Sequence, residues 1–84
     1  MTISKHHIKN PEMWLIYDMI KKANGEITTN ELINIVKDKE MIRRNIAYLH
    51  YFGLIKRYKS FGINNEIVYR YITTQTILSS GVKL

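Results

Sequence analysis

The sequence predicts a small α+β domain in which three helices are followed by a C-terminal β-hairpin. Apolar residues recur at helical spacing in three successive segments up to Gly53. Beyond Gly53, two runs rich in β-branched and aromatic residues flank a stretch with turn-forming Gly and Asn, which is the pattern of a hairpin. The 84 residues suffice for one domain with one modest core. We assign residues 10–74 to this domain, 1–9 to a flexible basic arm, and 75–84 to a C-terminal segment that is either dimerising or frayed.

The first helix is expected from Pro11 to Ala23. Asn10 is suited to cap its start, Pro11 to occupy the first helical position, and Asn24-Gly25 to end it. The side chains expected to face the core share helical spacing: Met13, Ile16, Met19, Ile20 and Ala23. Trp14, Leu15 and Tyr17 are then left on the outer side of the helix, where they form an apolar patch that needs cover.

A short extended link and a second helix follow. Glu26-Ile27-Thr28 reads as a minor third strand, and Thr28 with Glu31 fits the capping-box pattern, so the second helix begins there and ends near Lys37. Its residues expected in the core are Leu32, Ile35 and Val36. Asp38 is placed to cap the next helix, which leaves a tight turn between the two helices.

The third helix carries Ile42, Ile46 and Leu49 on one apolar stripe, with Arg43, Arg44 and Ala47 toward the opposite side. Gly53 ends this helix as a C′ glycine. The runs 54–59 and 67–72 then predict an antiparallel hairpin with a loop of about five to seven residues. Residues 73–84 fit a short fourth helix, an added strand or a frayed tail.

This order of elements resembles the winged helix-turn-helix family, and residues 42–55 are similar to the third helix and terminal Gly-Leu-Ile of bacterial and archaeal winged-helix regulators. The resemblance covers about residues 11–74. It implies a transcription regulator whose third helix enters the major groove and whose hairpin is the wing. Two features depart from the family: the turn 36–39 has no Gly, and Lys39-Glu40-Met41 replaces a Ser, Thr or Gln in the first turn of the third helix.

The charge pattern agrees with a double-stranded DNA partner. The net charge is +6 and the pI about 9.7, which favours an anionic partner. An Arg side chain fits guanine, Lys39 is suited to phosphate, and a carboxylate such as Glu40 accepts from cytosine. The alternatives are solvated arginines paired with carboxylates, and wing lysines that guard a strand edge. The residues expected at DNA are Lys39, Glu40, Arg43, Arg44, Tyr48, Lys56, Arg57, Lys59, Asn64, Asn65 and Arg70.

Other chemistries find little support in the sequence. The chain has no cysteine, and no nucleophilic triad, paired carboxylates or phosphate-cradling Gly loop stands out, so we expect no enzyme activity and no cofactor. His6 and His7 are adjacent and His50 stands alone, a poor pattern for a metal site. No apolar run is long enough for a membrane span, and we expect a cytoplasmic protein, in the host cell if the chain is viral. Composition suggests a thermophile, and small archaeal, viral or plasmid proteins of the family are its compositional neighbours.

A homodimer is expected, because one winged helix reads few base pairs and a small domain gains stability by association. The apolar residues left for the interface are Trp14, Leu15, Tyr17, Ile77 and Leu78. The alternative is that the C-terminal segment covers this patch within one chain. The alternative function is a winged-helix protein-interaction module or an accessory subunit of replication or transcription machinery, because fold does not determine function.

Overall fold

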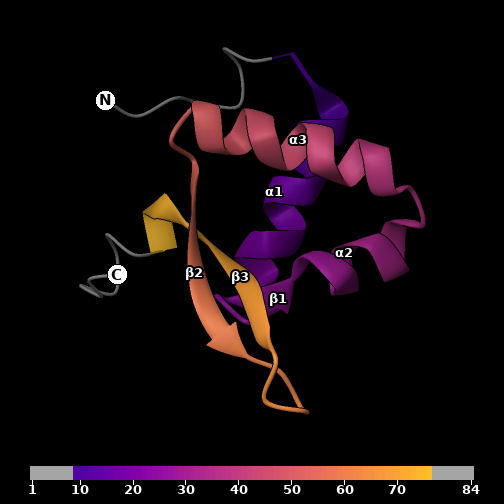
Figure 1. Ribbon diagram of the computed structural model, residues 1–84. Helices are drawn as coiled ribbons and strands as arrows, with labels where there is room; N and C mark the ends of the chain where they lie inside the picture. The colour runs from indigo at the N-terminus through magenta and orange to yellow at the C-terminus, as the bar shows by residue number, and fades with distance from the viewer. Residues whose placement is uncertain (1–8, 77–84) are drawn as a thin grey trace.

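The computed structural model describes residues 9–76 and confirms the α+β class. Three helices precede a C-terminal antiparallel hairpin, and a short strand joins that hairpin in a three-stranded antiparallel sheet of order β1-β3-β2. Figure 1 shows α3 crossing over α1, with α2 to one side and the hairpin projecting away from the helices. The topology is winged-helix-like. The elements are α1 Pro11–Ala23, β1 Ile27–Thr28, α2 Thr29–Val36, α3 Lys39–Tyr51, β2 Ile55–Phe61 and β3 Ile67–Thr73.

Side-chain caps set the starts of the helices. Asn10 Oδ1 accepts from the Met13 N–H at 3.2 Å, and Asp38 Oδ1 accepts from the Met41 N–H at 3.0 Å. Thr28 Oγ1 accepts from the Glu31 N–H at 3.2 Å, whereas Glu31 accepts from the Thr28 hydroxyl at 3.0 Å rather than from its backbone N–H. The predicted caps are therefore present, and in the capping box the Glu31 carboxylate bonds the hydroxyl of Thr28 instead of its backbone N–H.

Two residues with positive φ end α2 and α3. Lys37 caps α2 with φ 61° and ψ 31°, so a lysine adopts the left-handed conformation that usually favours Gly. Gly53 follows α3 with φ 69°, its N–H donates to His50 O at 3.0 Å, and the Leu54 N–H donates to Leu49 O at 2.9 Å. This pair of bonds is a Schellman motif, which turns the chain from α3 directly into β2.

The hairpin runs in uninterrupted register from Ile55↔Thr73 at its base to Phe61↔Ile67 at its end. Five residues, 62–66, connect the strands. Within them the Asn65 N–H donates to Gly62 O at 3.0 Å, and Asn65 takes a φ of 62° that Asn tolerates. At the other end, residues 74–76 are helical, and the rest of the C-terminal segment lies outside the described residues.

One apolar core joins all three helices and the base of the sheet. Three expectations about it were wrong. Ile35 is 64% exposed, because Leu32, Ile33 and Val36 form the inward face of α2. Tyr17 is 7% exposed and lies in the core, and Trp14 is half-buried against it, with the two rings edge to face at 5.3 Å. The inward face of α1 is thus wider than a narrow helical stripe. The fully buried core side chains are Met13, Ile16, Ile20, Leu32, Ile42, Leu49 and Ile55.

Substitutions at Lys37 and Gly53, the positive-φ residues that end α2 and α3, should have opposite effects on stability. A Cβ at Gly53 meets nothing within 4 Å, so Gly53→Ala introduces no steric clash. The variant should lose about 1–2 kcal/mol of unfolding free energy, because alanine is strained in the left-handed conformation. Lys37→Gly relieves the same kind of strain and should gain up to about 1 kcal/mol. Urea unfolding measures both, and losses in both variants would contradict the assigned backbone geometry.

Candidate nucleic-acid interface

The exposed side of α3 is opposite its core stripe. Ile42, Ile46 and Leu49 are buried, which leaves the charged residues of the first turns on the surface. Lys39 and Glu40 are exposed at the helix start, and Arg43 is exposed one turn later. Within the described part of the chain, the Arg43 guanidinium has no hydrogen bond or ion pair. Arg43 is therefore free to meet an external anion.

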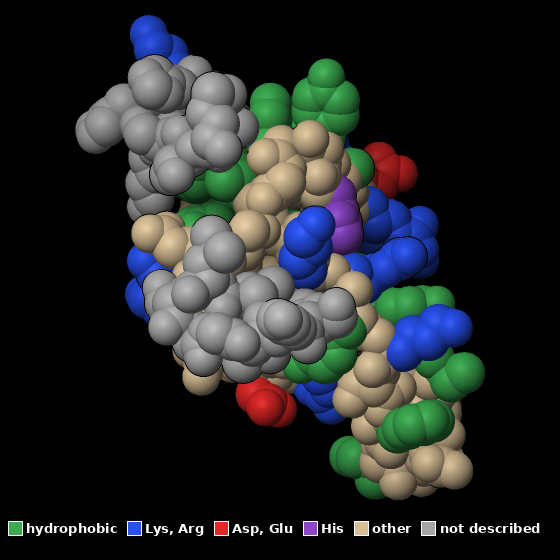
Figure 2. Space-filling model, turned by 90° about the vertical axis from the view of Figure 1, so that its left-hand side faces the viewer, with side chains coloured by type: hydrophobic (Ala, Val, Ile, Leu, Met, Phe, Trp, Pro, Cys, Tyr) green, Lys and Arg blue, Asp and Glu red, His purple; other side chains and the backbone are tan. Residues whose placement is uncertain are grey.

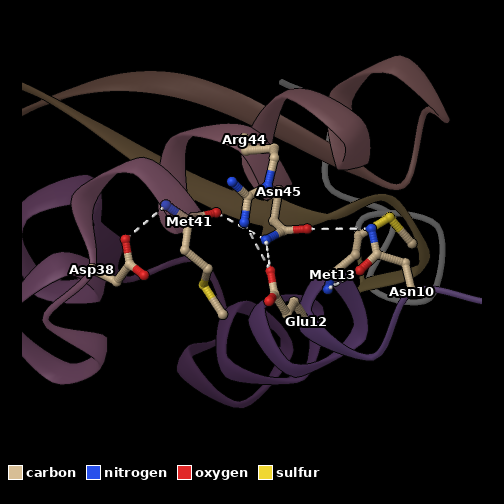
Figure 3. Close-up of polar contacts among 7 residues, drawn as sticks. All are labelled: Asn10, Glu12, Met13, Asp38, Met41, Arg44 and Asn45. Atoms are coloured by element: carbon tan, nitrogen blue, oxygen red, sulfur yellow. Dashed lines mark hydrogen bonds and ion pairs between the residues drawn. The ribbon is translucent and has the colours of Figure 1, made fainter.

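Arg44, in contrast, is held by α1. Its Nη2 lies 3.0 Å from Glu12 Oε2, with both side chains about half exposed, at 50% and 53%. Figure 3 shows that this carboxylate also receives the amide of Asn45, so that Arg44 belongs to a contact between α1 and α3. An exposed ion pair of this kind contributes little to stability, typically up to about 1 kcal/mol, but it occupies the arginine. The carboxylate-paired alternative thus describes Arg44 in this structure.

Asn45 is the polar residue that the sequence analysis missed. It is fully buried, and its Nδ2 donates to Met41 O at 2.9 Å and to Glu12 Oε2 at 3.3 Å. Its Oδ1 accepts from Asn10 Nδ2 at 3.4 Å, so all parts of the amide are satisfied (Figure 3). The available signal was its position, four residues after Met41 and four before Leu49, inside the apolar side of the helix.

Cations gather where the end of α3 meets the base of the hairpin. The His50 ring lies 6.3 Å from the Tyr71 ring, and Tyr71 is the register partner of Arg57. Burial lowers the pKa of His50 below its usual value, and the positive charges of Arg57 and then Lys56 lower it further. The Arg57 guanidinium stacks 4.4 Å above the Tyr69 ring. The neighbourhood of His50 is therefore electropositive.

The two faces of the hairpin differ. In an antiparallel ladder paired residues share a face, so the pairs Arg57↔Tyr71, Lys59↔Tyr69 and Phe61↔Ile67 lie together. This is the core-facing side of the sheet, since Ile55 and Tyr71 at its base are buried in the core. Beyond the helices the same face continues outward and is exposed. Lys59 and Arg57 therefore extend the electropositive region near His50 toward the hairpin end.

Arg70 lies on the other face and is engaged within the protein. Its Nε donates to Ser60 Oγ at 3.1 Å, one Nη donates to the Glu26 carbonyl, and the guanidinium lies 3.8 Å from Glu31. With its side chain 21% exposed, Arg70 ties β3 to the start of α2. Among the residues predicted to meet DNA, Arg70 thus makes structural contacts.

We define the basic face as Arg43, His50, Arg57 and Lys59. Arg43 and His50 are seven residues apart on α3, so they share one side of the helix about 10 Å apart. Figure 2 shows Lys and Arg side chains around a histidine on this side of the molecule. Lys39, Lys56, Asn64 and Asn65 are exposed outside this set, and Tyr48 is 43% exposed on the Arg44 side of α3.

Comparisons of the chain with protein-family models, curated proteins and solved structures returned no match. Among residues 9–76, no three His, Asp or Glu side chains come together in a way that could hold a metal ion. No helix in that range is long and apolar enough to cross a membrane. Of the residues expected at a dimer interface, Leu15 is 52% exposed, Tyr17 is buried in the core, and Ile77 and Leu78 lie outside the described residues.

His50 should make stability depend on pH. Because folding lowers its pKa below the value of 6.5, the neutral ring is favoured in the folded state. Its full contribution is present above pH of about 6.5 and is lost as the pH falls below that value. Urea unfolding from pH about 7.5 to 5.5 should show a falling free energy of unfolding, with a weaker fall in His50→Gln. Equal pH dependence in the two proteins would rule out this role.

Proposed function

We propose that this protein binds double-stranded DNA, with α3 at the major groove and the hairpin as a wing. The observation that carries the proposal is the basic face, in which an unpaired arginine on α3 is continuous with His50 and with exposed cations of the hairpin. Exposed cations on one face can contact the phosphates of a duplex, and such contacts supply affinity that does not depend on sequence.

In this proposal, Arg43 recognises the DNA base sequence. Its guanidinium is free, and the fork of donors on an arginine fits O6 and N7 of guanine. Glu40, three residues earlier on α3, is exposed and has the chemistry to accept from a cytosine amino group. The winged-helix-like topology favours a transcription regulator that acts as a homodimer. One winged helix contacts only a few base pairs, and two copies would contact twice as many.

The rival function is docking to a protein of the replication or transcription machinery. It is favoured by exposed aromatic side chains on the other side of α3, where Tyr51 is 84% and Tyr48 is 43% exposed. Tyrosine is enriched at protein interfaces. Tyr51→Ser, at a residue outside the expected DNA contacts, should leave DNA affinity within about twofold if the basic face is the functional surface.

Binding to duplex DNA should be salt-sensitive. If the basic face and its neighbouring lysines neutralise about four to five phosphates, log affinity should fall with log salt with a slope of about −4. Fluorescence anisotropy of a labelled random duplex, titrated at several salt concentrations from about 50 to 200 mM, measures this slope. Absence of binding at the lowest salt, or an affinity indifferent to salt, would refute the DNA proposal.

The two neighbouring arginines should behave differently. Arg43→Ala should cost about 1–3 kcal/mol of binding free energy on a selected site and relax its sequence preference, whereas Arg44→Ala should cost less because Arg44 already pairs with Glu12. Lys59→Ala should weaken all sequences alike and make the salt slope shallower by about one. Lys22→Ala, an exposed cation at the end of α1, is the control. A larger loss from Arg44→Ala than from Arg43→Ala would reverse the assignment.

A further inference from the structure

The end of the hairpin is apolar, although it is a solvent-exposed turn. Phe61 is 67% exposed, Ile67 is 62% exposed, and Ile63 is fully exposed at 102%. Phe61 and Ile67 are register partners, and Ile63 lies inside the turn closed by the Asn65 N–H and Gly62 O. Figure 2 shows apolar side chains on this projecting end, below the cations. Turn positions usually carry small or polar residues, so three large apolar side chains here call for an explanation.

The apolar end continues the basic face. Along β2 the residues Arg57, Lys59 and Phe61 alternate onto one face, and their β3 partners Tyr71, Tyr69 and Ile67 share it. Phe61 lies four positions after Arg57 on the extended strand, a distance of about 13 Å. A cation that contacts a phosphate therefore places Phe61 and Ile63 beyond the backbone, within reach of the adjacent groove.

We propose that Phe61, Ile63 and Ile67 form a wedge that enters the minor groove, partly unstacks one base step and bends the duplex. This proposal rests on the proposed DNA binding and adds a mode of binding to it. Phe and Ile are among the side chains that proteins insert between base steps from the minor groove. The groove is about 6 Å wide, so the end of a hairpin enters with its side chains rather than as a whole ribbon. Such a contact favours flexible sequences without reading base edges.

The charge of the hairpin favours DNA over other occupants. Strands and turn together carry four basic residues and a single acidic one, Glu66. The Glu66 carboxylate accepts from the Asn64 N–H at 2.9 Å and is thereby held against the turn. Insertion into a bilayer requires this carboxylate and the polar turn backbone to leave water, which is costly.

The size of the apolar end argues against a protein partner. A buried aromatic side chain contributes roughly 150–250 Å². One aromatic and two isoleucine side chains cover less than the roughly 800 Å² that each partner contributes to a standard protein interface. They are sufficient, however, for one unstacked base step, where a single side chain replaces the neighbouring base.

The experiment compares wild type with Ile63→Ser, which removes a side chain exposed at 102% and so leaves the fold intact. Ile35→Ser is the matched control, because Ile35 is 64% exposed on α2. Fluorescence energy transfer between the ends of a duplex of about 30 base pairs reports bending, and 2-aminopurine at a central TA step reports unstacking. Wild type and Ile35→Ser should bend the duplex by roughly 20–90° and raise 2-aminopurine emission, and Ile63→Ser should do neither.

A second measurement uses a duplex with a central mismatch, in which part of the deformation is already present. Wild type should bind it about tenfold more tightly than the matched duplex, whereas Phe61→Ser with Ile63→Ser should bind both alike. Salt-sensitive binding by wild type without bending or mismatch preference would overturn the wedge and leave DNA binding intact. No duplex binding at all would overturn both. Loss of sedimentation with phosphatidylserine vesicles, or of self-association, in Ile63→Ser with DNA bending unchanged would reassign the apolar end to a membrane or to a second copy.

Discussion

The buried amide of Asn45 determines how α3 lies on α1. An amide without hydrogen bonds in an apolar interior costs several kcal/mol. The bond to Met41 O lies within α3, but the bonds to Glu12 and Asn10 reach α1 and its cap, so they favour orientations of α3 in which Asn45 meets both. Apolar packing alone tolerates small rotations of one helix on another. Since Gly53 turns the chain straight from α3 into β2, the direction of the hairpin follows from the same orientation. The amide therefore also positions the basic face.

Local signals in the sequence were sufficient for the elements and their order. Asn10, Thr28 and Asp38 act through backbone N–H groups three residues away, and Gly53 acts through the two residues around it. Such signals are complete within a short window, which is why the helix starts and the end of α3 were predictable. Lys37 shows where they fail: nothing in its neighbourhood favours a positive φ, and the tertiary packing of α2 and α3 imposes it.

The site was less predictable, because it depends on partners far away in the chain. Arg43 and Arg44 are adjacent and alike, and only the position of Glu12, 32 residues before Arg44, distinguishes them. In the sequence Arg70 resembles the other cations of the hairpin, but in the structure it donates hydrogen bonds to Ser60 and to the Glu26 carbonyl. Helical periodicity likewise placed Tyr17 outside and Ile35 inside. Periodicity predicts one buried stripe per helix, and it does not show where a second neighbouring element buries further residues.

The junction between β1 and β3 closes a large loop of the chain. Arg70 reaches the Glu26 carbonyl 44 positions away, and the hydroxyls of Thr29 and Tyr71 lie 2.8 Å apart across 42 positions. Both α2 and α3 lie inside this loop. The start of α2 is therefore held against β3, the central strand of the sheet, so a force that tilts the hairpin also acts on α2. Strain at the far end of the hairpin is thereby transmitted to the base of α2 rather than absorbed in a flexible connection.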